Sequence, residues 1–569
     1  MSSLHRSPVI VGLVAAALIA GPAWASQTPT SSPSGASHPT SVIAAKKKKS
    51  AKGTLSITVS GSGSYTVTGK GFRKAGTASK SFKVKPGVYT VKAPTGSVTP
   101  GKVKVRKGKA TRVTVTFPTG PSAPTPTETP PVPTPTPRPS DTPTSPPPPS
   151  QPGATGVVQR VSTAADGSQA AYSFDGSFES AWSPDGTRVA FASAATNLVP
   201  GDTNNTTDVF VKNLTTGAIQ RISTDSVGTQ ANGWSRDPVW SPDGTKIAFA
   251  SFAYNLVPGD AYGGPVAIFV KTLASGAIQR VSADATGVKA NGDSWDTPGF
   301  RPSWSPDSTR IAFTSAATNL VPGDTNGDVD VFVKTLVSGA IERISVDATG
   351  TQAANGSGEP AWSPDGTKIA FASSSDDLAP GDNNHHGDVL VKTLESGVVQ
   401  MVSLDATGTQ AHGSSMAPVW SPDGTKIAFN SGANNLVPGD TNDTQDVFVK
   451  TLASGAIQRI STDAAGTQGN DYSESQVWSP DGTKIAFISD SDNLVSGDTN
   501  DTLDVFVKTL ASGAVQVVSA DAGGAQGNKP SDDPEWSPDG TKLAFTSTAS
   551  NLISGDSNDA RDVFVKTLG

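Results

Sequence analysis

A five-residue motif, Trp-Ser-Pro-Asp-Gly, recurs through the chain at a nearly fixed period. It begins at Trp182, Trp240, Trp362, Trp420, Trp478 and Trp536, and a seventh copy at Trp304 has Ser308 in place of the glycine. Successive motif tryptophans are 58, 64, 58, 58, 58 and 58 residues apart. A repeat of this length indicates a fold in which one supersecondary unit is stacked many times.

Each motif is typical of a turn between two strands. Its serine, proline and glycine fit a type I turn, in which glycine tolerates a positive φ. A β-prone run such as Lys426-Ile427-Ala428-Phe429 follows, so each motif is expected to close a β-hairpin. We expect the tryptophan to pack between neighbouring sheets rather than to contact a ligand. Ser308 is expected to strain the third turn slightly or to change its type.

The fifth repeat shows the whole unit. Strand A ends at Trp420, and strands B, C and D are expected at 426–430, 446–452 and 456–461. Seven such units predict an all-β fold, a seven-bladed β-propeller of four-stranded blades over 157–569. Residues 157–162 read as a strand D without a blade before it. We expect this N-terminal strand to complete the last blade and close the ring, which removes open strand edges.

The Trp-Ser-Pro-Asp-Gly repeats resemble those of TolB-type, WD40-like β-propellers. The resemblance covers 157–569 and implies the propeller fold, but such propellers host many unrelated functions. Some relatives are prolyl oligopeptidases, yet the chain contains no Gly-x-Ser-x-Gly run. Some lyases of this type hold a metal with several histidines near the central channel. His385, His386 and His412 lie on two predicted loops and do not rebuild that pattern.

The chain before the repeats divides into four segments. Residues 1–25 are typical of a secretory signal peptide, with a basic start, a short apolar run and a small-residue cleavage site. Residues 26–52 are rich in serine, threonine and lysine and are expected to be disordered. Residues 53–117 alternate apolar and polar residues, as strands of a small β-sandwich-like module do. Residues 118–156 form a linker rich in proline and threonine.

The small module and the propeller carry opposite charge. Residues 46–117 contain 15 lysines, 3 arginines and no acidic residue, whereas 157–569 contain 24 basic and 48 acidic residues. The run 86–91 within the module resembles small surface modules of the carboxypeptidase-regulatory or PEGA kind. Its charge favours binding to an anionic cell-wall polymer, with a plain solvated surface as the alternative. Nucleic acid is not expected, because no recognition motif interleaves aromatic and basic residues.

Six of the seven loops between strands B and C carry an Asp-x-Asn-x-x-x-Asp pattern. Oxygen ligands at this spacing predict calcium sites, and an Asx turn at the start of strand C is the alternative interpretation. The residues are Asp202, Asn204, Asp208, Asp324, Asn326, Asp330, Asp382, Asn384, Asp388, Asp440, Asn442, Asp446, Asp498, Asn500, Asp504, Asp556, Asn558 and Asp562.

A ligand site is expected on the face that holds the B–C and D–A loops, because these loops are long and varied whereas the turns on the other face are monotonous. The loops around the second and third repeats also hold the only two non-motif tryptophans of the repeat region. Clustered aromatic residues favour recognition of a carbohydrate or a protein, with coverage of the blade ends as the alternative. The predicted site comprises Trp234, Arg236, Tyr254, Tyr262, Asp293, Trp295, Phe300 and Arg301.

Together these features predict an exported, monomeric binding or scaffold propeller, extracellular or associated with the cell wall. The chain contains no cysteine, and no later stretch is long and apolar enough to span a membrane. The alternative is an extracellular enzyme that acts on polysaccharide through carboxylates of one face. The sequence shows no histidine, cysteine or nucleophile constellation, and it predicts no catalytic residues.

Overall fold

The computed structural model describes two parts of the chain. These are residues 53–116, with gaps at 61–64, 70–71, 77–79, 86, 93–96, 100–101 and 106–109, and residues 156–568, with gaps at 261–262 and 295–300. They belong to two separate compact units, 1–142 and 143–569. The predicted signal peptide, the segment 26–52 and nearly all of the linker lie outside the described residues.

The N-terminal unit contains two four-stranded sheets, in the orders β4-β1-β8-β6 and β3-β2-β5-β7. The strands are β1 (Gly53–Ser60), β2 (Tyr65–Gly69), β3 (Phe72–Gly76), β4 (Lys80–Val84), β5 (Gly87–Lys92), β6 (Ser97–Thr99), β7 (Lys102–Val105) and β8 (Ala110–Thr116). Alternate apolar residues of both sheets, among them Leu55, Val67 and Val113, form one buried core. This packing of two sheets is that of a small β-sandwich.

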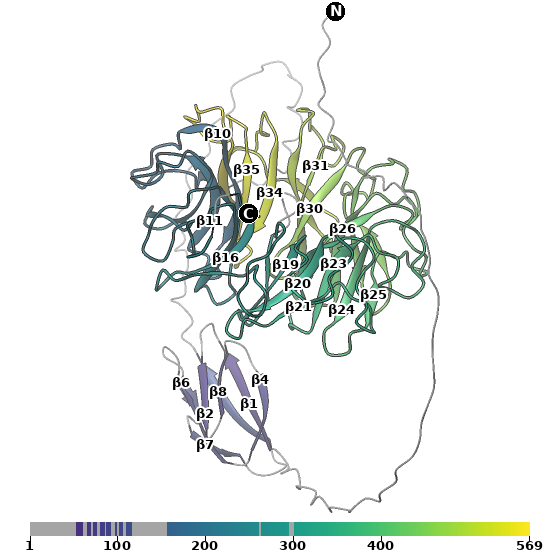
Figure 1. The fold of residues 1–569 in the computed structure, drawn as a ribbon. Helices are drawn as coiled ribbons and strands as arrows, with labels where there is room; N and C mark the ends of the chain where they lie inside the picture. The colour runs from purple at the N-terminus through teal and green to yellow at the C-terminus, as the bar shows by residue number, and fades with distance from the viewer. Residues whose placement is uncertain are drawn as a thin grey trace, which may run out of the picture. The chain divides into compact units, whose positions relative to one another are not determined.

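The second unit contains seven four-stranded antiparallel sheets (Figure 1). Their first strands are β10 (Tyr172–Trp182), β14 (Ser235–Trp240), β18 (Ser303–Trp304), β22 (Ser357–Trp362), β26 (Ser415–Trp420), β30 (Ser473–Trp478) and β34 (Ser531–Trp536). The second strands are β11 (Arg188–Ala195), β15 (Lys246–Ser251), β19 (Arg310–Ser315), β23 (Lys368–Ser373), β27 (Lys426–Ser431), β31 (Lys484–Ser489) and β35 (Lys542–Ser547).

The third and fourth strands complete each sheet. The third strands are β12 (Asp208–Asn213), β16 (Ala267–Thr272), β20 (Asp330–Thr335), β24 (Asp388–Thr393), β28 (Asp446–Thr451), β32 (Asp504–Thr509) and β36 (Asp562–Thr567). The fourth strands are β13 (Ile219–Arg221), β17 (Ile278–Arg280), β21 (Ile341–Arg343), β25 (Val399–Met401), β29 (Ile457–Arg459), β33 (Val515–Val517) and, in the last sheet, β9 (Val158–Arg160).

The seven sheets close into a ring. Each first strand contacts the first strand of the next sheet, and β34 contacts β10 in turn. The N-terminal strand β9 pairs with β36, so the last blade joins the two ends of the unit. The prediction of an all-β, seven-bladed propeller closed by its N-terminal strand is confirmed. Within the described residues, no helix has the length and apolar character needed to cross a membrane.

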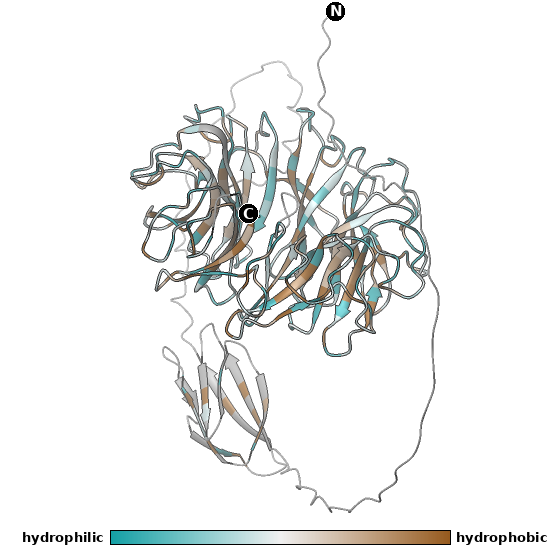
Figure 2. Cartoon of the chain, in the orientation of Figure 1, coloured by the Kyte–Doolittle hydropathy of each residue, from teal (hydrophilic) through white to brown (hydrophobic). Residues whose placement is uncertain are grey.

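The core lies between the blades. One cluster joins Ala190 and Val209 of the first blade to Trp240, Phe249 and Phe269 of the second, and similar clusters recur around the ring. Figure 2 shows the apolar residues gathered on the strands and the polar residues mainly on the loops. The second and third strands are buried along almost their whole length, and burial of their apolar side chains is the main stabilising term of the ring.

The motif tryptophans join each blade to the one before it, as predicted. Trp240 Nε1 donates a hydrogen bond to the Ala181 carbonyl at 3.1 Å, and Trp182 Nε1 donates to the Glu535 carbonyl at 3.1 Å across the closure of the ring. Their indole rings are almost fully buried. A buried indole needs such an acceptor, and six of the seven motif tryptophans have one in the preceding blade. Trp362 Nε1 is the exception, with no hydrogen-bond partner among the described residues.

Ser308 does not change the conformation of the third turn. Its φ is 60°, close to the 68° of Gly244 in the preceding motif. The Asp243 N–H donates to Ser308 Oγ at 3.0 Å, a contact with the neighbouring turn that glycine cannot make. Of the two expected outcomes, slight strain is the one that the structure supports, because a positive φ at a serine costs some backbone strain while the turn keeps its conformation.

Candidate functional site

Three loops of the second and third blades lie side by side. The Asn232 N–H donates to Asn255 Oδ1 at 3.0 Å, which joins the loop entering blade 2 to the loop after β15. The loop entering blade 3 is joined to the same region by Asp293, whose Oδ1 accepts a hydrogen bond from the Val266 N–H at 2.7 Å. These bonds fix variable loops on the rigid frame of the blades.

Aromatic rings gather on the blade 2 loops. Trp234 stacks on Phe252 with ring centroids 6.2 Å apart and an interplanar angle of 9°. Phe252 is 39% exposed and Tyr254 is 36% exposed, and no other described phenylalanine, tyrosine or tryptophan side chain is as exposed. We call Trp234, Phe252 and Tyr254 the blade 2 aromatic patch.

Arg236 contacts the Trp234 ring of this patch. Its guanidinium lies 5.6 Å from the Trp234 ring and 5.0 Å from the Phe178 ring. Arg236 is half-buried, so it orients the indole by cation–π contact rather than reaching into solvent. The structure thus brings Trp234 and Arg236 together and adds Phe252, which the sequence did not single out.

Two other described residues of the predicted site, Asp293 and Arg301, do not join the aromatic patch. Asp293 uses its carboxylate to bind the backbone of Val266, and Arg301 lies among the first strands. Tyr262, Trp295 and Phe300 lie outside the described residues.

Arg301 belongs to a group of charged residues around the axis of the ring, which we call the axial cluster: Glu179, Asp237, Arg301, Asp533 and Glu535. Arg301 Nε lies 3.7 Å from Asp237 Oδ1, and an Arg301 Nη donates to the Ser180 carbonyl of the first blade at 3.2 Å. The Asp237 N–H donates to Glu179 Oε2 at 2.7 Å. The cluster therefore links blades 7, 1, 2 and 3.

The axial cluster holds more carboxyl groups than its single arginine neutralises. Burial, with the Asp237 carboxylate beside it, raises the pKa of Glu179 to about 8. Burial and Asp533 raise the pKa of Glu535 to about 7. Burial opposes the charge of Arg301, but the surrounding carboxylates outweigh that effect and raise its pKa.

The sequence analysis missed the acidic members of this cluster. Glu179, Asp237 and Asp533 all lie three residues before a motif tryptophan, where blades 5 and 6 carry Ala417 and Ser475. The acid at this position recurs in part of the ring, since Glu359 holds it in blade 4, whereas Arg301 replaces it in blade 3. Comparison of that one position between repeats would have revealed the asymmetry.

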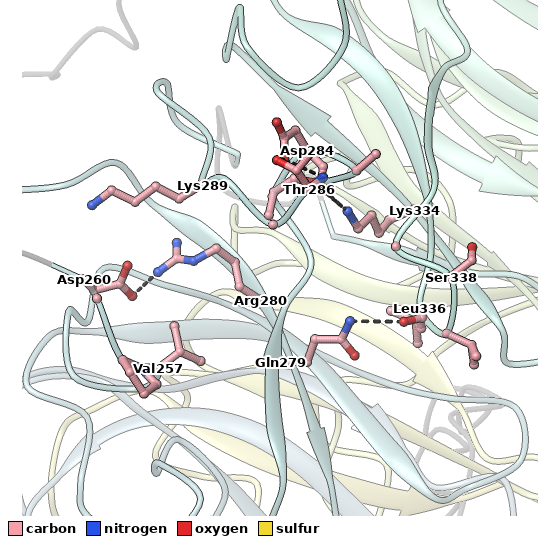
Figure 3. A pocket seen from close by; sticks show the side chains of 17 residues that line it. Val257, Asp260, Gln279, Arg280, Asp284, Thr286, Lys289, Lys334, Leu336 and Ser338 are labelled. Atoms are coloured by element: carbon pink, nitrogen blue, oxygen red, sulfur yellow. Dashed lines mark hydrogen bonds and ion pairs between the residues drawn. The ribbon is translucent and has the colours of Figure 1, made fainter.

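A groove with a volume of about 680 Å³ lies between blades 2 and 3, and Figure 3 shows the side chains that line it. Arg280, Asp260 and Lys289 line it, and the same three residues also line a shallow notch under Phe252 and Tyr254. Arg280 and Asp260 form a largely buried ion pair. Asp260, Arg280 and Lys289 therefore connect the groove to the aromatic patch.

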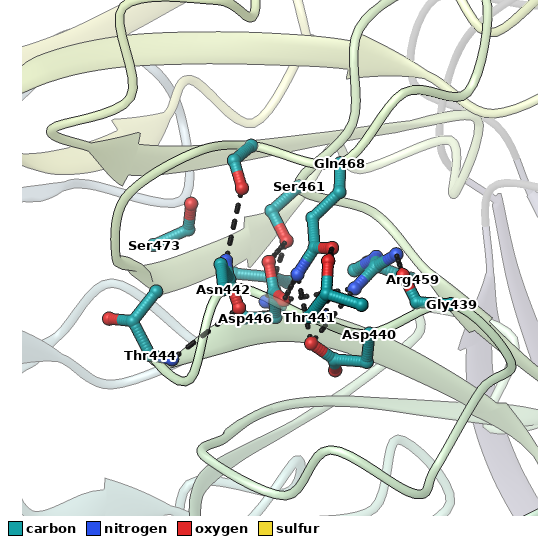
Figure 4. A network of polar contacts seen from close by, with 12 residues as sticks. Gly439, Asp440, Thr441, Asn442, Thr444, Asp446, Arg459, Ser461, Gln468 and Ser473 are labelled. Carbon is teal, nitrogen blue, oxygen red and sulfur yellow. Dashed lines mark hydrogen bonds and ion pairs between the residues drawn. The ribbon is translucent and has the colours of Figure 1, made fainter.

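The acidic B–C loops are held by a network of protein donors, shown for blade 5 in Figure 4. Arg459 Nη1 lies 3.2 Å from both Asp440 Oδ1 and Asp446 Oδ2. Gln468 Nε2 donates to Asp440 Oδ1 at 2.8 Å, and Asn442 Nδ2 donates to the Gly469 carbonyl at 3.0 Å. These contacts supply the positive charge and the donors that the carboxylates need.

Asx-turn contacts are present in the same loops, as in the alternative interpretation: the His386 N–H donates to Asn384 Oδ1 at 2.9 Å. In the described part of the chain, no three or more His, Asp or Glu side chains are grouped so that they could hold a metal ion. Calcium binding stays a prediction.

No protein-family model matches the chain. Dipeptidyl-peptidase 5 of Porphyromonas gingivalis is 30% identical over 142 residues, which are 24% of this chain and 18% of that peptidase. The match thus spans less than a fifth of that relative.

Several solved structures have a similar arrangement of strands. An oligogalacturonate lyase in complex with manganese is 14% identical, with 74% of this chain and 95% of that chain covered and a TM-score of 0.45. A protein described as TolB from Agrobacterium tumefaciens is 18% identical, with 62% and 94% covered and a TM-score of 0.35. These likenesses are too distant to indicate an activity, and the assignment of the propeller rests on the sheet topology given above.

Proposed function

We propose that the protein is an exported binding propeller that recognises its ligand on the loop face of blade 2. The observation that carries this proposal is the blade 2 aromatic patch, where the two exposed aromatic side chains of the described residues stand beside a groove. Exposed aromatic rings on a rigid frame are typical of recognition surfaces.

The position of the patch supports the proposal further. Phe252 and Tyr254 stand on loops that hydrogen bonds fix to the neighbouring loop, since the Phe252 N–H donates to the Trp234 carbonyl at 2.9 Å. A fixed surface loses little conformational entropy when a ligand binds. Coverage of a blade end alone would not require rings that remain more than a third exposed.

A glycan array and a pull-down assay with the double variant Phe252→Ala, Tyr254→Ala test the proposal. Tyr472→Ala is the matched control, because Tyr472 stands in blade 6 at the position that Trp234 holds in blade 2. We expect the double variant to lose the ligands of the wild type and the control to keep them. A double variant that retains every ligand contradicts the assignment of this face.

Export and attachment to the cell wall form the second part of the proposal. Residues 1–25 support export, and the positive charge of 46–117 supports attraction to an anionic cell-wall polymer. The proline-rich linker would hold the propeller at a distance from that polymer.

The axial cluster is the one observation that favours an enzyme instead. Carboxyl groups whose pKa values lie near 7 to 8, as for Glu535 and Glu179, are suited to general acid–base catalysis. A reducing-end assay on polysaccharides with the wild type and with Glu535→Gln tests this alternative. Cleavage that the variant abolishes would establish it, and absence of cleavage by the wild type would exclude it for those substrates.

A further inference from the structure

The groove between blades 2 and 3 differs in charge from the equivalent positions of the other blades. Six repeats place a glutamine after the fourth strand, such as Gln230 in the first blade, and the second repeat alone has Lys289 there. The third strand starts with an aspartate in the other six blades, such as Asp208, and with Ala267 in blade 2. Both changes make this groove more positive.

The contacts show what these two changes do. In the first blade, Arg221 lies 3.4 Å from Asp202 and 3.6 Å from Asp208, so two carboxylates share one guanidinium. In blade 2, Arg280 forms an ion pair with Asp260. Ala267 stands where the first blade has Asp208 and supplies no second carboxylate. In the first blade two carboxylates face one arginine, whereas in blade 2 one carboxylate faces one arginine. The extra negative charge found in the first blade is therefore missing beside Arg280.

Lys289 is the cation that remains available. Lys334 also lines the groove, but its Nζ donates to the carbonyls of Ala283 and Asp284 at 2.7 Å each, and the residue is buried. Lys289 is half-buried, and its ammonium group makes no hydrogen bond or ion pair among the described residues. Figure 3 shows it on the same side of the groove as Arg280 and Asp260.

We infer that this groove binds an anionic oligosaccharide that bears carboxylates, with Lys289 pairing a carboxylate and Tyr254 and Phe252 contacting the apolar face of a sugar ring. This inference rests on the proposed function, because it names the ligand class of the same face.

Three features favour this ligand class. The groove volume of about 680 Å³ is that of a typical small-ligand site. A free ammonium beside exposed aromatic rings matches a sugar that carries both a carboxylate and a C–H face. The charged residues that line the groove are Arg280, Lys289, Lys334, Asp260 and Asp284, a net charge of +1. The propeller as a whole is acidic, with 48 acidic and 24 basic residues, so this groove is a local site for an anion.

The test uses calorimetry with the full chain, an oligomer of galacturonic acid as the probe, and a neutral glucose oligomer of the same length as its control. Lys289→Gln restores the residue of the other six repeats, so the fold should tolerate it. Lys368→Gln makes the same change of charge near the turn on the opposite face and is the matched control variant.

We expect the wild type to prefer the acidic oligomer, and Lys289→Gln to weaken its binding about tenfold or more. Lys368→Gln should have no effect, and high salt should weaken binding of the wild type. Absence of binding of the acidic oligomer, or equal binding by wild type and Lys289→Gln, overturns the inference. Loss of the acidic oligomer by Lys289→Gln but not by Phe252→Ala, Tyr254→Ala would retain the cationic groove and overturn the aromatic patch.

Discussion

Single residues of the axial cluster make the stability of the propeller depend on pH. Glu179 has a pKa of about 8 in the folded protein against 4.5 for an ordinary glutamate, so the folded state favours the protonated form. The stability from this group is fully present below about pH 4.5 and is lost as the pH rises towards 8. Glu535 acts in the same direction.

We therefore predict that the free energy of unfolding falls between about pH 5 and pH 8, by up to about 1.4 kcal/mol per pH unit for each such group. Glu179→Gln keeps an acceptor for the Asp237 N–H and should flatten this dependence. Glu395→Gln, at an exposed position, is the control. Urea unfolding at several pH values measures the effect, and an equal slope in Glu179→Gln and wild type would contradict the role given to Glu179.

The acidic loops lead to a prediction about calcium. Arginine neutralises the paired carboxylates in blades 1, 3, 5 and 7, but Met401 and Val517 stand at that position in blades 4 and 6. Burial and the nearby carboxylates of Asp388 and Asp376 raise the pKa of Asp382 to about 6. Calcium, which prefers carboxylate oxygens, should therefore prefer these two loops.

Calorimetry should then show calcium heat that Asp382→Asn and Asp498→Asn reduce and that Asp440→Asn leaves unchanged, because Arg459 already pairs with Asp440. A wild type without calcium heat, and with a melting temperature that a chelator does not change, would remove the calcium prediction.

At the scale of residues, the sequence predicted contacts that every blade repeats and missed contacts that arise once. The motif tryptophans pack between blades, as expected from seven copies of the same local pattern. The axial cluster escaped prediction because Arg301 reaches Ser180 across 121 positions of sequence. Such a contact depends on the closed ring, which no local pattern encodes.

At the scale of elements, closure of the ring depends on strand β9, which pairs with β36 as the fourth strand of the last blade. Val161 follows β9, is fully buried, and packs with Val563 and Val565 of β36. Val281 holds the equivalent place after β17 in blade 2 and is also fully buried. If β9 completes the last blade as a regular fourth strand, the two valines should contribute equally to stability.

We predict that Val161→Ala and Val281→Ala each lower the free energy of unfolding by about 2 kcal/mol, because each removes two buried methyl groups. Chemical denaturation measures both. A cost for Val281→Ala without a cost for Val161→Ala would show that the ring is not closed by β9.

The strands and their order were predictable, but one irregularity of the first strand was not. Non-glycine residues with positive φ, such as Glu179 at 57° and Glu359 at 55°, interrupt the pairing of first and second strands. A side chain of the preceding blade can hold the backbone of such a residue, since the N–H of Ala417, whose φ is 53°, donates to Glu359 Oε2 at 2.6 Å. Sequence alone gives glutamate no preference for this conformation.

At the scale of the whole molecule, the fixed period and the unpaired end strands were sufficient to predict the ring. The site was less predictable, because it depends on departures from the repeat. The sequence identified the second and third blades through Trp234, Trp295 and the longer spacing, yet Phe252 and Lys289 emerged only when the structure placed them around one notch beside the groove.

The opposite charges of the two units predict salt-dependent attachment. The full chain should bind teichoic acid at low salt and release it as salt screens the charges over about 8 Å at physiological ionic strength. A chain that starts at residue 143 lacks the basic module and should not bind. Equal binding by both chains would place the polymer site on the propeller.

Hydrogen–deuterium exchange of the full chain, with and without the galacturonic acid oligomer, reports where a ligand lies on the ring. We predict slower exchange in the segments that contain Phe252, Tyr254 and Lys289. We predict no change at the motif turns of the opposite face, such as 421–425. Protection confined to the first strands around Glu179 and Asp237 would contradict the claim that the loop face of blade 2 is the ligand surface.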